Sequence, residues 1–321
     1  MPTILQFTQA LFAPETAFTT LKGIEVVCTA DGAPVLRRTT RYAEAEVLLE
    51  GRRYLLSMPL SLGAVAQTER TLTALQRLHH PALAAVRWLP AEWRIATPDG
   101  RTHCISLVLQ ELPGEPLRES IHRFSSQGLA EAIAQLKADL ATLNLAHHNL
   151  KVENLRNVEG RLVPIRYFYA TLDGASEEDR KALDGIYTEL AGDEQFTLSD
   201  CDLAYDPRPA LLGHKWVGNE FEGLICVEDE AGFGYVDAMN RVVIEPRFRW
   251  ADDFHEGRAV VETHEGMALI DREGRYVLPP IYEIVEYRPA DTLIQARQGG
   301  LWARFDYLGR QISPFAVEFE I

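Results

Sequence analysis

Cysteine, long apolar runs and basic residues are all scarce in this sequence, and each shortage excludes a class of protein. Only four of the 321 residues are cysteines, at Cys28, Cys104, Cys201 and Cys226. Their spacing contains no Cys-x-x-Cys pair, which excludes a zinc site or redox centre of that type, and four distant thiols are not a disulfide framework. We therefore expect free thiols in a reducing cytoplasm.

No apolar run approaches the roughly 20 residues that a membrane-spanning helix requires. Residues 1–7 lack the basic region and unbroken apolar core of a secretory signal. Lys and Arg number 32 against 47 Asp and Glu, which gives a formal net charge of −15. Nucleic acids and anionic membranes select clustered Lys and Arg, so the sequence predicts a cytoplasmic protein that binds neither.

The remaining composition is that of a globular protein, with 46% apolar and 25% charged residues. Its length predicts two domains of roughly 150 residues each. Helical patterns alternate with strand-like stretches as far as about residue 205, and short strands separated by glycines follow from residue 212. A polar, proline-interrupted segment lies between them. We predict an α+β domain at 1–205 and antiparallel β-repeats at 212–321.

The second part contains an internal repeat. Its proline and aspartate markers recur at intervals of 34 or 35 residues, at Pro246, Pro280 and Pro314 and at Asp237, Asp271 and Asp306. Each unit predicts β-hairpins whose turns use Gly or Asn, with a third strand that ends at the proline. We expect the aspartates to cap turns by accepting hydrogen bonds from nearby backbone N–H groups. One such unit cannot cover its apolar face, so the units must stack.

These units resemble the WG-repeat family over about residues 221–315. The aromatic-Gly pair of the family corresponds to Phe233-Gly234, Met267-Ala268 and Trp302-Ala303, and residues 254–261 match its Phe-x-Glu-Gly-x-Ala-x-Val segment. The resemblance implies β-rich repeats and protein binding, without a defined reaction. We expect the repeated aromatic rings to lie mainly in the core, with Trp250, Trp302 and Phe233 as candidates for an exposed peptide-binding groove.

A different pattern marks the first part. Residues 128–143 form a predicted amphipathic helix, with Leu129, Ile133, Leu136, Leu140 and Leu143 on one stripe. Residues 147–155 follow it and are similar to the protein-kinase catalytic loop His-Arg-Asp-Leu-Lys-x-x-Asn. Residues 72–81 resemble the end of the kinase αC helix, and residues 107–114 resemble the hinge. The resemblance to protein kinases covers about residues 20–190.

Phosphoryl transfer needs four parts that this sequence has replaced. The stretch that matches the phosphate-covering loop, residues 39–48, contains no glycine and carries two glutamates. Ser57 stands for the phosphate-binding lysine, Asn149 for the catalytic base and Arg166 for the metal-binding aspartate, whereas Lys151 and Asn154 are retained. An amide cannot accept a proton at neutral pH, and a cation repels a metal ion. The resemblance therefore implies a pseudokinase.

The kinase-like part is also short. Residues 176–192 offer a single further helix, with Ser176 as predicted N-cap and Gly192 as predicted C-cap. The histidine pairs at 79–80 and 147–148 have no third ligand at metal-binding spacing, so we interpret them as loop anchors. We predict no metal and no cofactor.

The sequence thus predicts a non-catalytic scaffold that binds a protein partner of unknown identity. Two alternatives remain open. The first is a nucleotide-binding switch or atypical kinase. The second gives the repeats a purely structural role, in which they complete the core of the truncated lobe.

Overall fold

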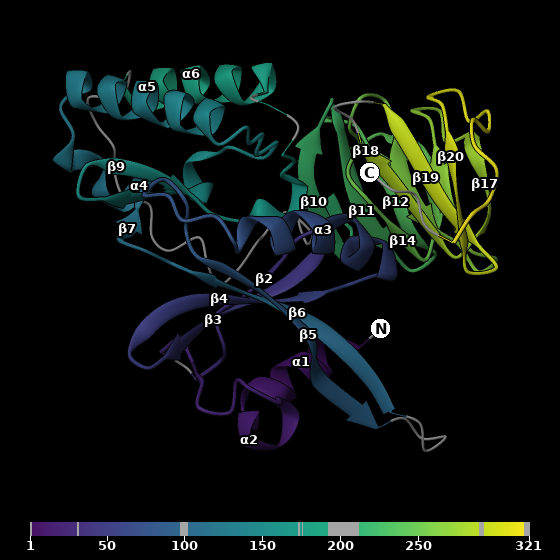
Figure 1. The fold of residues 1–321 in the computed structure, drawn as a ribbon, viewed down its shortest axis with the longest axis horizontal. Helices are drawn as coiled ribbons and strands as arrows, with labels where there is room; N and C mark the ends of the chain where they lie inside the picture. Colours follow the sequence, from purple (N-terminus) through teal and green to yellow (C-terminus); the bar gives the residue numbers. More distant parts are fainter. Residues whose placement is uncertain are drawn as a thin grey trace.

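The computed structural model describes residues 2–30, 32–96, 102–172, 174, 176–191, 212–288 and 292–317. Three parts meet around helix α3 (Leu62–Leu75): a sheet with the N-terminal helices, a layer with two long helices, and a stack of small sheets (Figure 1). The strand pairs among the described residues are antiparallel, and the C-terminal third is β-rich, which agrees with the predicted α+β class. The predicted linker lies outside the described residues.

The first sheet has the strand order β1-β3-β4-β6-β5, with β2 paired to β3. Its strands are β1 (Glu25–Val26), β2 (Leu36–Arg38), β3 (Tyr42–Leu49), β4 (Arg52–Pro59), β5 (Val86–Ala96) and β6 (Thr102–Glu111). Helices α1 (Ile4–Leu11) and α2 (Pro14–Ala17) lie below the sheet in Figure 1, and α3 lies above it. Leu55 and Leu56 are both buried because they face opposite covered sides of β4.

The helical layer follows the sheet. It contains α4 (Leu117–Ser120), α5 (Ser126–Thr142) and α6 (Glu177–Ala191), the short strands β7 (Glu115–Pro116), β8 (Leu155–Val158) and β9 (Arg161–Pro164), and the 3₁₀ turns η1 (Ile121–Arg123), η2 (Val152–Asn154) and η3 (Tyr167–Tyr169). The predicted stripe on α5 is confirmed, with Leu129, Ile133, Leu136 and Leu140 buried. The Ser176 hydroxyl accepts hydrogen bonds from the first turn of α6, as predicted, and Gly192 lies outside the described residues.

The repeats form three small sheets. The strands are β10 (Trp216–Phe221), β11 (Leu224–Asp229), β12 (Gly232–Val236) and β13 (Val242–Phe248) in the first, β14 (Trp250–Ala251), β15 (Ala259–Glu262), β16 (Met267–Ile270) and β17 (Tyr276–Tyr282) in the second, and β18 (Ile284–Arg288), β19 (Leu293–Gln298) and β20 (Leu301–Phe305) in the third. The sheets pack one after another, as stacked repeats require (Figure 1).

The prediction that proline ends the third strand of each unit is wrong for the first two units. β13 continues through Pro246 to Phe248, and β17 continues through Pro280 to Tyr282. Both are the last strands of their sheets, so the missing N–H of proline breaks no ladder, and the pairing shifts register there. The shifted chain passes so close to Gly234 that an added Cβ would lie 2.6 Å from the backbone nitrogen of Pro246. This close approach explains the glycine after the aromatic residue in the first unit.

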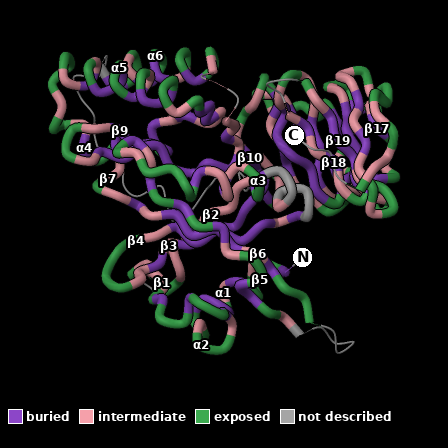
Figure 2. The backbone as a smooth tube through the Cα atoms, viewed as in Figure 1, coloured by how far each residue is buried: buried purple, intermediate pink, exposed green. Residues whose placement is uncertain are grey.

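Each later unit covers the unit before it. The turn at Gly274 lies against Ile244 of β13, where Arg247 donates a hydrogen bond to the Gly274 carbonyl at 2.8 Å. The turn at Gly309 lies against the backbone of Val277 in β17 in the same way. One hydrophobic cluster also includes residues of the sheet, the helical layer and the second and third units, and Figure 2 shows buried backbone in all three parts. The repeats therefore share their core with the first part.

Candidate functional site

A buried ion pair lies between the first sheet and the helical layer. Nε of Arg166, the residue before η3, donates to Oε2 of Glu44 on β3 at 2.8 Å. Glu44 is fully buried and Arg166 is 7% exposed. Glu44 stands directly opposite Ser57 on the neighbouring strand β4. The ion pair thus joins the two segments that would face a nucleotide in the kinase interpretation.

The polar neighbours of Arg166 hold its guanidinium in one orientation. Its Nη1 donates to Oδ1 of Asn154 at 3.0 Å, and its backbone N–H donates to Oε1 of Gln110 at 2.7 Å. Asn154 in turn donates to the carbonyl oxygen of Asn149 at 2.8 Å. The positive φ of Arg166, 67°, turns the chain so that its side chain reaches this cluster. The structure therefore brings together Ser57, Asn149, Asn154 and Arg166, four of the predicted positions.

Lys151, the fifth position, points elsewhere. Its ammonium group lies 4.9 Å from the ring centroid of Phe221 on β10, a cation–π contact with the repeats. Among the described residues, no three His, Cys, Asp or Glu side chains gather in the manner of metal ligands. The cluster around Arg166 is arranged to hold two protein segments together, and its central cation opposes the binding of a metal ion.

The loop that contains these residues is anchored from α6. The carboxylate of Asp179 accepts the backbone N–H groups of His147 at 2.5 Å and His148 at 2.9 Å. Nε2 of His147 donates to the carbonyl oxygen of Ile165 at 3.0 Å, while its Nδ1 is buried without a partner. Burial lowers the pKa of His147 to about 4, so the ring is neutral near pH 7. These contacts support the interpretation of this histidine as a loop anchor.

A second buried ion pair joins the first part to the repeats. Arg41, just before β3, donates from Nε and Nη2 to the two carboxylate oxygens of Asp252, at 2.8 and 2.6 Å. Its Nη1 donates to the carbonyl oxygen of Phe168 at 2.7 Å, and its guanidinium lies over the ring of Tyr169. One arginine therefore connects the sheet, the segment after β9 and the repeats.

The neighbouring carboxylate, Asp253, adds to this junction. It accepts hydrogen bonds from the hydroxyl groups of Thr40, at 2.9 Å, and Tyr169. Burial, followed by the charge of Asp252, raises the pKa of Asp253 to about 6. Neither aspartate was predicted from the sequence as a junction residue. No local pattern signals a contact between positions 211 residues apart.

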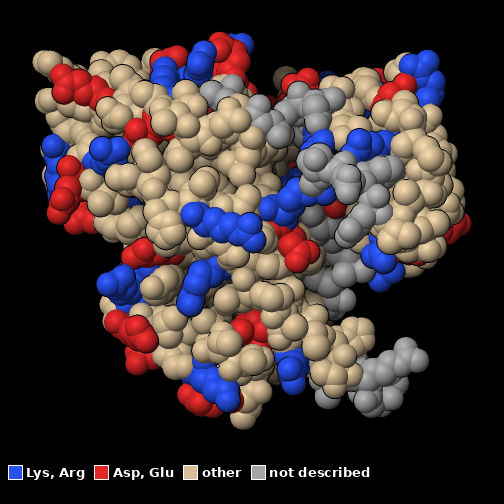
Figure 3. Space-filling model, in the orientation of Figure 1, with Lys and Arg blue, Asp and Glu red and all other residues tan. Residues whose placement is uncertain are grey.

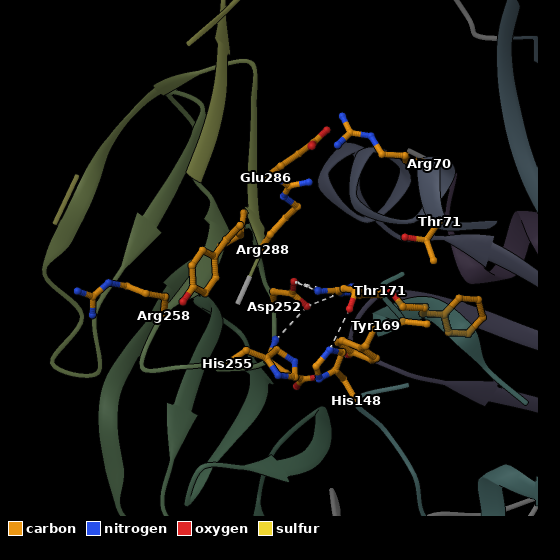
Figure 4. A pocket seen from close by; sticks show the side chains of 16 residues that line it. Arg70, Thr71, His148, Tyr169, Thr171, Asp252, His255, Arg258, Glu286 and Arg288 are labelled. Atoms are coloured by element: carbon orange, nitrogen blue, oxygen red, sulfur yellow. Dashed lines mark hydrogen bonds and ion pairs between the residues drawn. The ribbon is translucent and has the colours of Figure 1, made fainter. Parts of the chain in front are cut away.

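A cavity of about 80 Å³ lies beside this junction. Its walls come from α3, the segment after η3, the loop at His148 and strands of the second and third repeat units (Figure 4). His148 approaches Thr171 at 3.3 Å and Glu178 at 3.4 Å on one side, and Glu286 and Arg288 of β18 lie on another.

The three candidate binding aromatics occupy different environments. Trp250 is 3% exposed and donates from its indole N–H to the carbonyl oxygen of Thr40 at 2.9 Å. Phe233 is also buried, against Trp216 and the guanidinium of Arg38. Trp302 is half-buried on β20. Trp250 and Phe233 therefore serve the core and the junction, which is the role expected for most of the repeated rings, and they present no open groove.

The predicted turn-capping role of the repeat aspartates is confirmed. In each unit the aspartate Oδ1 accepts hydrogen bonds from the backbone N–H groups two and four residues further on. Its Oδ2 accepts a hydrogen bond from Nε of the arginine four residues further on. The pairs are Asp237–Arg241, Asp271–Arg275 and Asp306–Arg310. These hydrogen bonds hold the pKa of Asp237 below its usual value. The three carboxylates act separately, each within its own turn.

The fold thus defines a protein with a mixed α/β part and stacked antiparallel β-repeats. The sequence model of the WG containing repeat family matches residues 233–265 and 267–302. This match confirms the WG-repeat resemblance for the first two units, and the third unit repeats their turn geometry at Asp306. A comparison with curated proteins finds no match. No helix among the described residues has the length and apolar character needed to cross a membrane. The kinase interpretation of residues 20–190 stays a prediction.

Proposed function

We propose that this protein is a non-catalytic scaffold that binds a protein partner through WG repeats attached to a kinase-like domain without phosphotransfer activity. The buried pair between Glu44 and Arg166 carries the proposal. In the kinase interpretation, this carboxylate and this guanidinium correspond to positions where a kinase needs room for nucleotide phosphates and a site for magnesium. A carboxylate and a guanidinium that are bonded to each other leave neither.

The arrangement of elements supports the kinase-like part of the proposal. An antiparallel sheet with α3 on one face precedes the layer of α5 and α6, and the loop with Asn149 follows α5 directly. The hairpin of β8 and β9 then leads to Arg166, at the place of the metal-binding aspartate. This order of landmarks is the one that a kinase sequence follows.

A thermal-shift titration with Mg-ATP tests the loss of nucleotide binding. We expect no change in melting temperature up to millimolar nucleotide, because a ligand stabilises a fold only when it binds the folded state. A saturable rise would favour the alternative of a nucleotide-binding switch. Incorporation of labelled phosphate into the chain or into a generic substrate would favour the atypical kinase.

The outer strands of the repeats offer a surface for the partner. Four exposed apolar side chains lie on β13 and β17, namely Val242, Val243, Tyr276 and Ile281. Val242 and Tyr276 occupy equivalent positions 34 residues apart, so stacking places apolar side chains at the same site of successive units. Clustered exposed apolar residues mark interaction sites more often than isolated ones do.

The test compares two serine variants in co-isolation from the source cell, read by quantitative mass spectrometry. We expect Val242→Ser with Tyr276→Ser to lose a partner that the wild-type protein retains. Leu5→Ser, which changes an apolar residue on α1 that is more exposed than either of these, is the control outside the repeats. Retention of every partner by the double variant would contradict the proposed surface.

The alternative in which the repeats complete the core has its own support. Trp250 and Asp252 of the second unit are bonded to Thr40 and Arg41 of the first part. We expect a fragment of residues 1–205 to be insoluble or to lack a cooperative unfolding transition. A folded, soluble fragment would exclude the structural role and leave the binding role.

A further inference from the structure

The cavity at the junction holds more arginines than carboxylates, although the whole chain carries a net charge of −15. Its arginines are Arg41, Arg70, Arg258 and Arg288, and its carboxylates are Asp252, Asp253 and Glu286. On the face shown in Figure 3, acidic and basic side chains are interspersed. In an acidic protein, a cavity with an excess of arginine is a place where an anion meets little electrostatic repulsion.

Two of the three carboxylates of this cavity, Asp252 and Asp253, are hydrogen-bonded to the protein itself. Arg41 occupies both oxygens of Asp252, and Thr40 and Tyr169 donate to Asp253. Figure 4 shows Arg70 of α3 and Glu286 of β18 pointing toward each other from opposite walls. Burial raises the pKa of Glu286, and the charges of Arg70 and Arg288 oppose this rise.

The described lining of the cavity includes a phenol and an imidazole that lack a hydrogen-bond partner. The hydroxyl oxygen of Tyr287 and Nε2 of His255 are both buried, and Tyr287 is 9% exposed as a whole. Burial raises the pKa of Tyr287 and lowers that of His255 to about 3, so the phenol keeps its proton and the imidazole is neutral. Buried polar groups without partners are rare in folded proteins, and a phenol and an imidazole of this kind in one cavity indicate a missing polar partner.

We propose that this cavity binds a compact oxyanion, a phosphate or carboxylate group, which accepts hydrogen bonds from Tyr287 and His255 and is balanced by Arg70 and Arg288. The volume of about 80 Å³ suits a small group, because pockets for drug-sized ligands measure roughly 300 to 1,000 Å³. A nucleotide is too large for it.

The oxyanion comes either from solution as a free ion or from an acidic side chain of a partner. In both cases it contacts α3 on one wall and β18 on the other, so its binding ties the first part to the repeats. A ligand that binds only the assembled junction stabilises the folded state, and this stabilisation grows with the logarithm of the ligand concentration once the concentration exceeds Kd.

Thermal unfolding of the full chain tests the site, with potassium chloride used to match ionic strength. Inorganic phosphate and acetate probe the free ion, and an N-acetylated, C-amidated acidic dipeptide probes the side chain. We expect a saturable rise in melting temperature with at least one probe. Arg70→Gln and Tyr287→Phe should each weaken the apparent affinity about tenfold, because hydrogen bonds to a charged group are strong.

The matched control is Arg249→Gln, which removes the same charge from an exposed arginine outside the cavity and should leave the affinity unchanged. A response to phosphate or acetate assigns a free ion, and a response to the dipeptide alone assigns a partner's side chain. No saturable response to any probe, or equal responses of Arg70→Gln and the wild type, would overturn the proposal and leave water as the occupant.

Discussion

Among the described residues, two buried arginine–carboxylate pairs differ in what they join. The pair between Glu44 and Arg166 lies within the first part, whereas the pair between Arg41 and Asp252 joins that part to the repeats. Both are shielded from water, but Asp252 has both oxygens bonded to one guanidinium, and Oε1 of Glu44 has no partner. The junction is therefore the better satisfied of the two sites.

This difference separates the two roles of a buried ion pair. A buried ion pair is seldom more stabilising than apolar residues of the same volume. Its hydrogen bonds, however, form in only one relative position of the two segments that it joins. At Arg166 the pair links β3 to the segment after β9, and this bears on the proposed absence of phosphotransfer. At Arg41 it fixes the position of the repeats, and this bears on the assembly of the whole chain.

The largest expected effect comes from Arg41→Met. The change leaves Asp252 and Asp253 as adjacent buried carboxylates without a cation, and removing one partner of a buried pair costs roughly 3 to 5 kcal/mol. We expect a loss at the upper end of this range, measured as the free energy of unfolding in urea. Arg38→Met, which removes an arginine whose side chain is 26% exposed and paired to Glu228, is a control that should lose less.

A double variant separates the charge effect from the lost packing. Arg41→Met combined with Asp252→Leu removes both charges, so we expect it to be more stable than Arg41→Met alone. If the two variants are equally unstable, the arginine acts through its hydrogen bond to Phe168 rather than through the ion pair.

Arg166→Met has the second-largest effect and tests the other pair. Glu44 then stays buried without its cation, and we expect a loss of about 3 kcal/mol in the same urea experiment. The loss should be smaller than for Arg41→Met, because only one carboxylate, that of Glu44, loses its cation. The double variant Arg166→Met with Glu44→Gln should be more stable than Arg166→Met alone. Equal stability of the two variants would show that the two charges are not coupled.

Local patterns predicted much of the fold. The stripe of Leu129, Ile133, Leu136 and Leu140 predicted α5, because the periodicity of a helix is visible among residues close together in the sequence. The interval of 34 residues predicted the repeats and their aspartate-capped turns for the same reason. The prediction that proline ends a strand was wrong in the first two units, because proline interrupts pairing only where a neighbouring strand needs its N–H.

The junction could not be predicted in this way. Arg41 and Asp252 belong to different parts of the chain, and each looks like an ordinary surface residue in its own segment. Periodicity also identified Trp250 as a repeated aromatic without revealing that its indole reaches Thr40. Contacts between distant segments depend on how whole layers pack, and no short sequence pattern predicts this packing.

Gly309→Ala is expected to have a smaller effect, confined to the repeats. Gly309 has a φ of +79°, and an added Cβ would collide with the backbone carbonyl of Val277 in the preceding unit. We expect a loss of about 2 to 3 kcal/mol from strain and overpacking. Gly185→Ala in α6 meets nothing within 4 Å and should gain about 0.5 to 1 kcal/mol. Equal effects of the two changes would contradict the close stacking of the units.

The smallest effect concerns acid, and its sign should differ between the two regions. The pKa of His147 in the first part falls from 6.5 to about 4 on folding, so its contribution to stability is complete above pH 6.5 and is lost as the pH falls toward 4. Between pH 7 and pH 5 this amounts to about 2 kcal/mol. The pKa of Asp253 at the junction rises from 3.8 to about 6, so its contribution grows by about 1 kcal/mol over the same interval.

Urea unfolding at pH 7 and pH 5 checks both signs. His147→Gln keeps an amide N–H for the carbonyl of Ile165 and should reduce the loss on acidification. Asp253→Asn should increase it, because the compensating proton uptake disappears. Burial also lowers the pKa of His255 to about 3, so His255 makes both variants less stable in acid. The pH dependence of each variant is therefore compared with that of the wild type. An unchanged pH dependence in His147→Gln would show that the ring gains no proton on unfolding, and the contrast between the two regions would then rest on Asp253 alone.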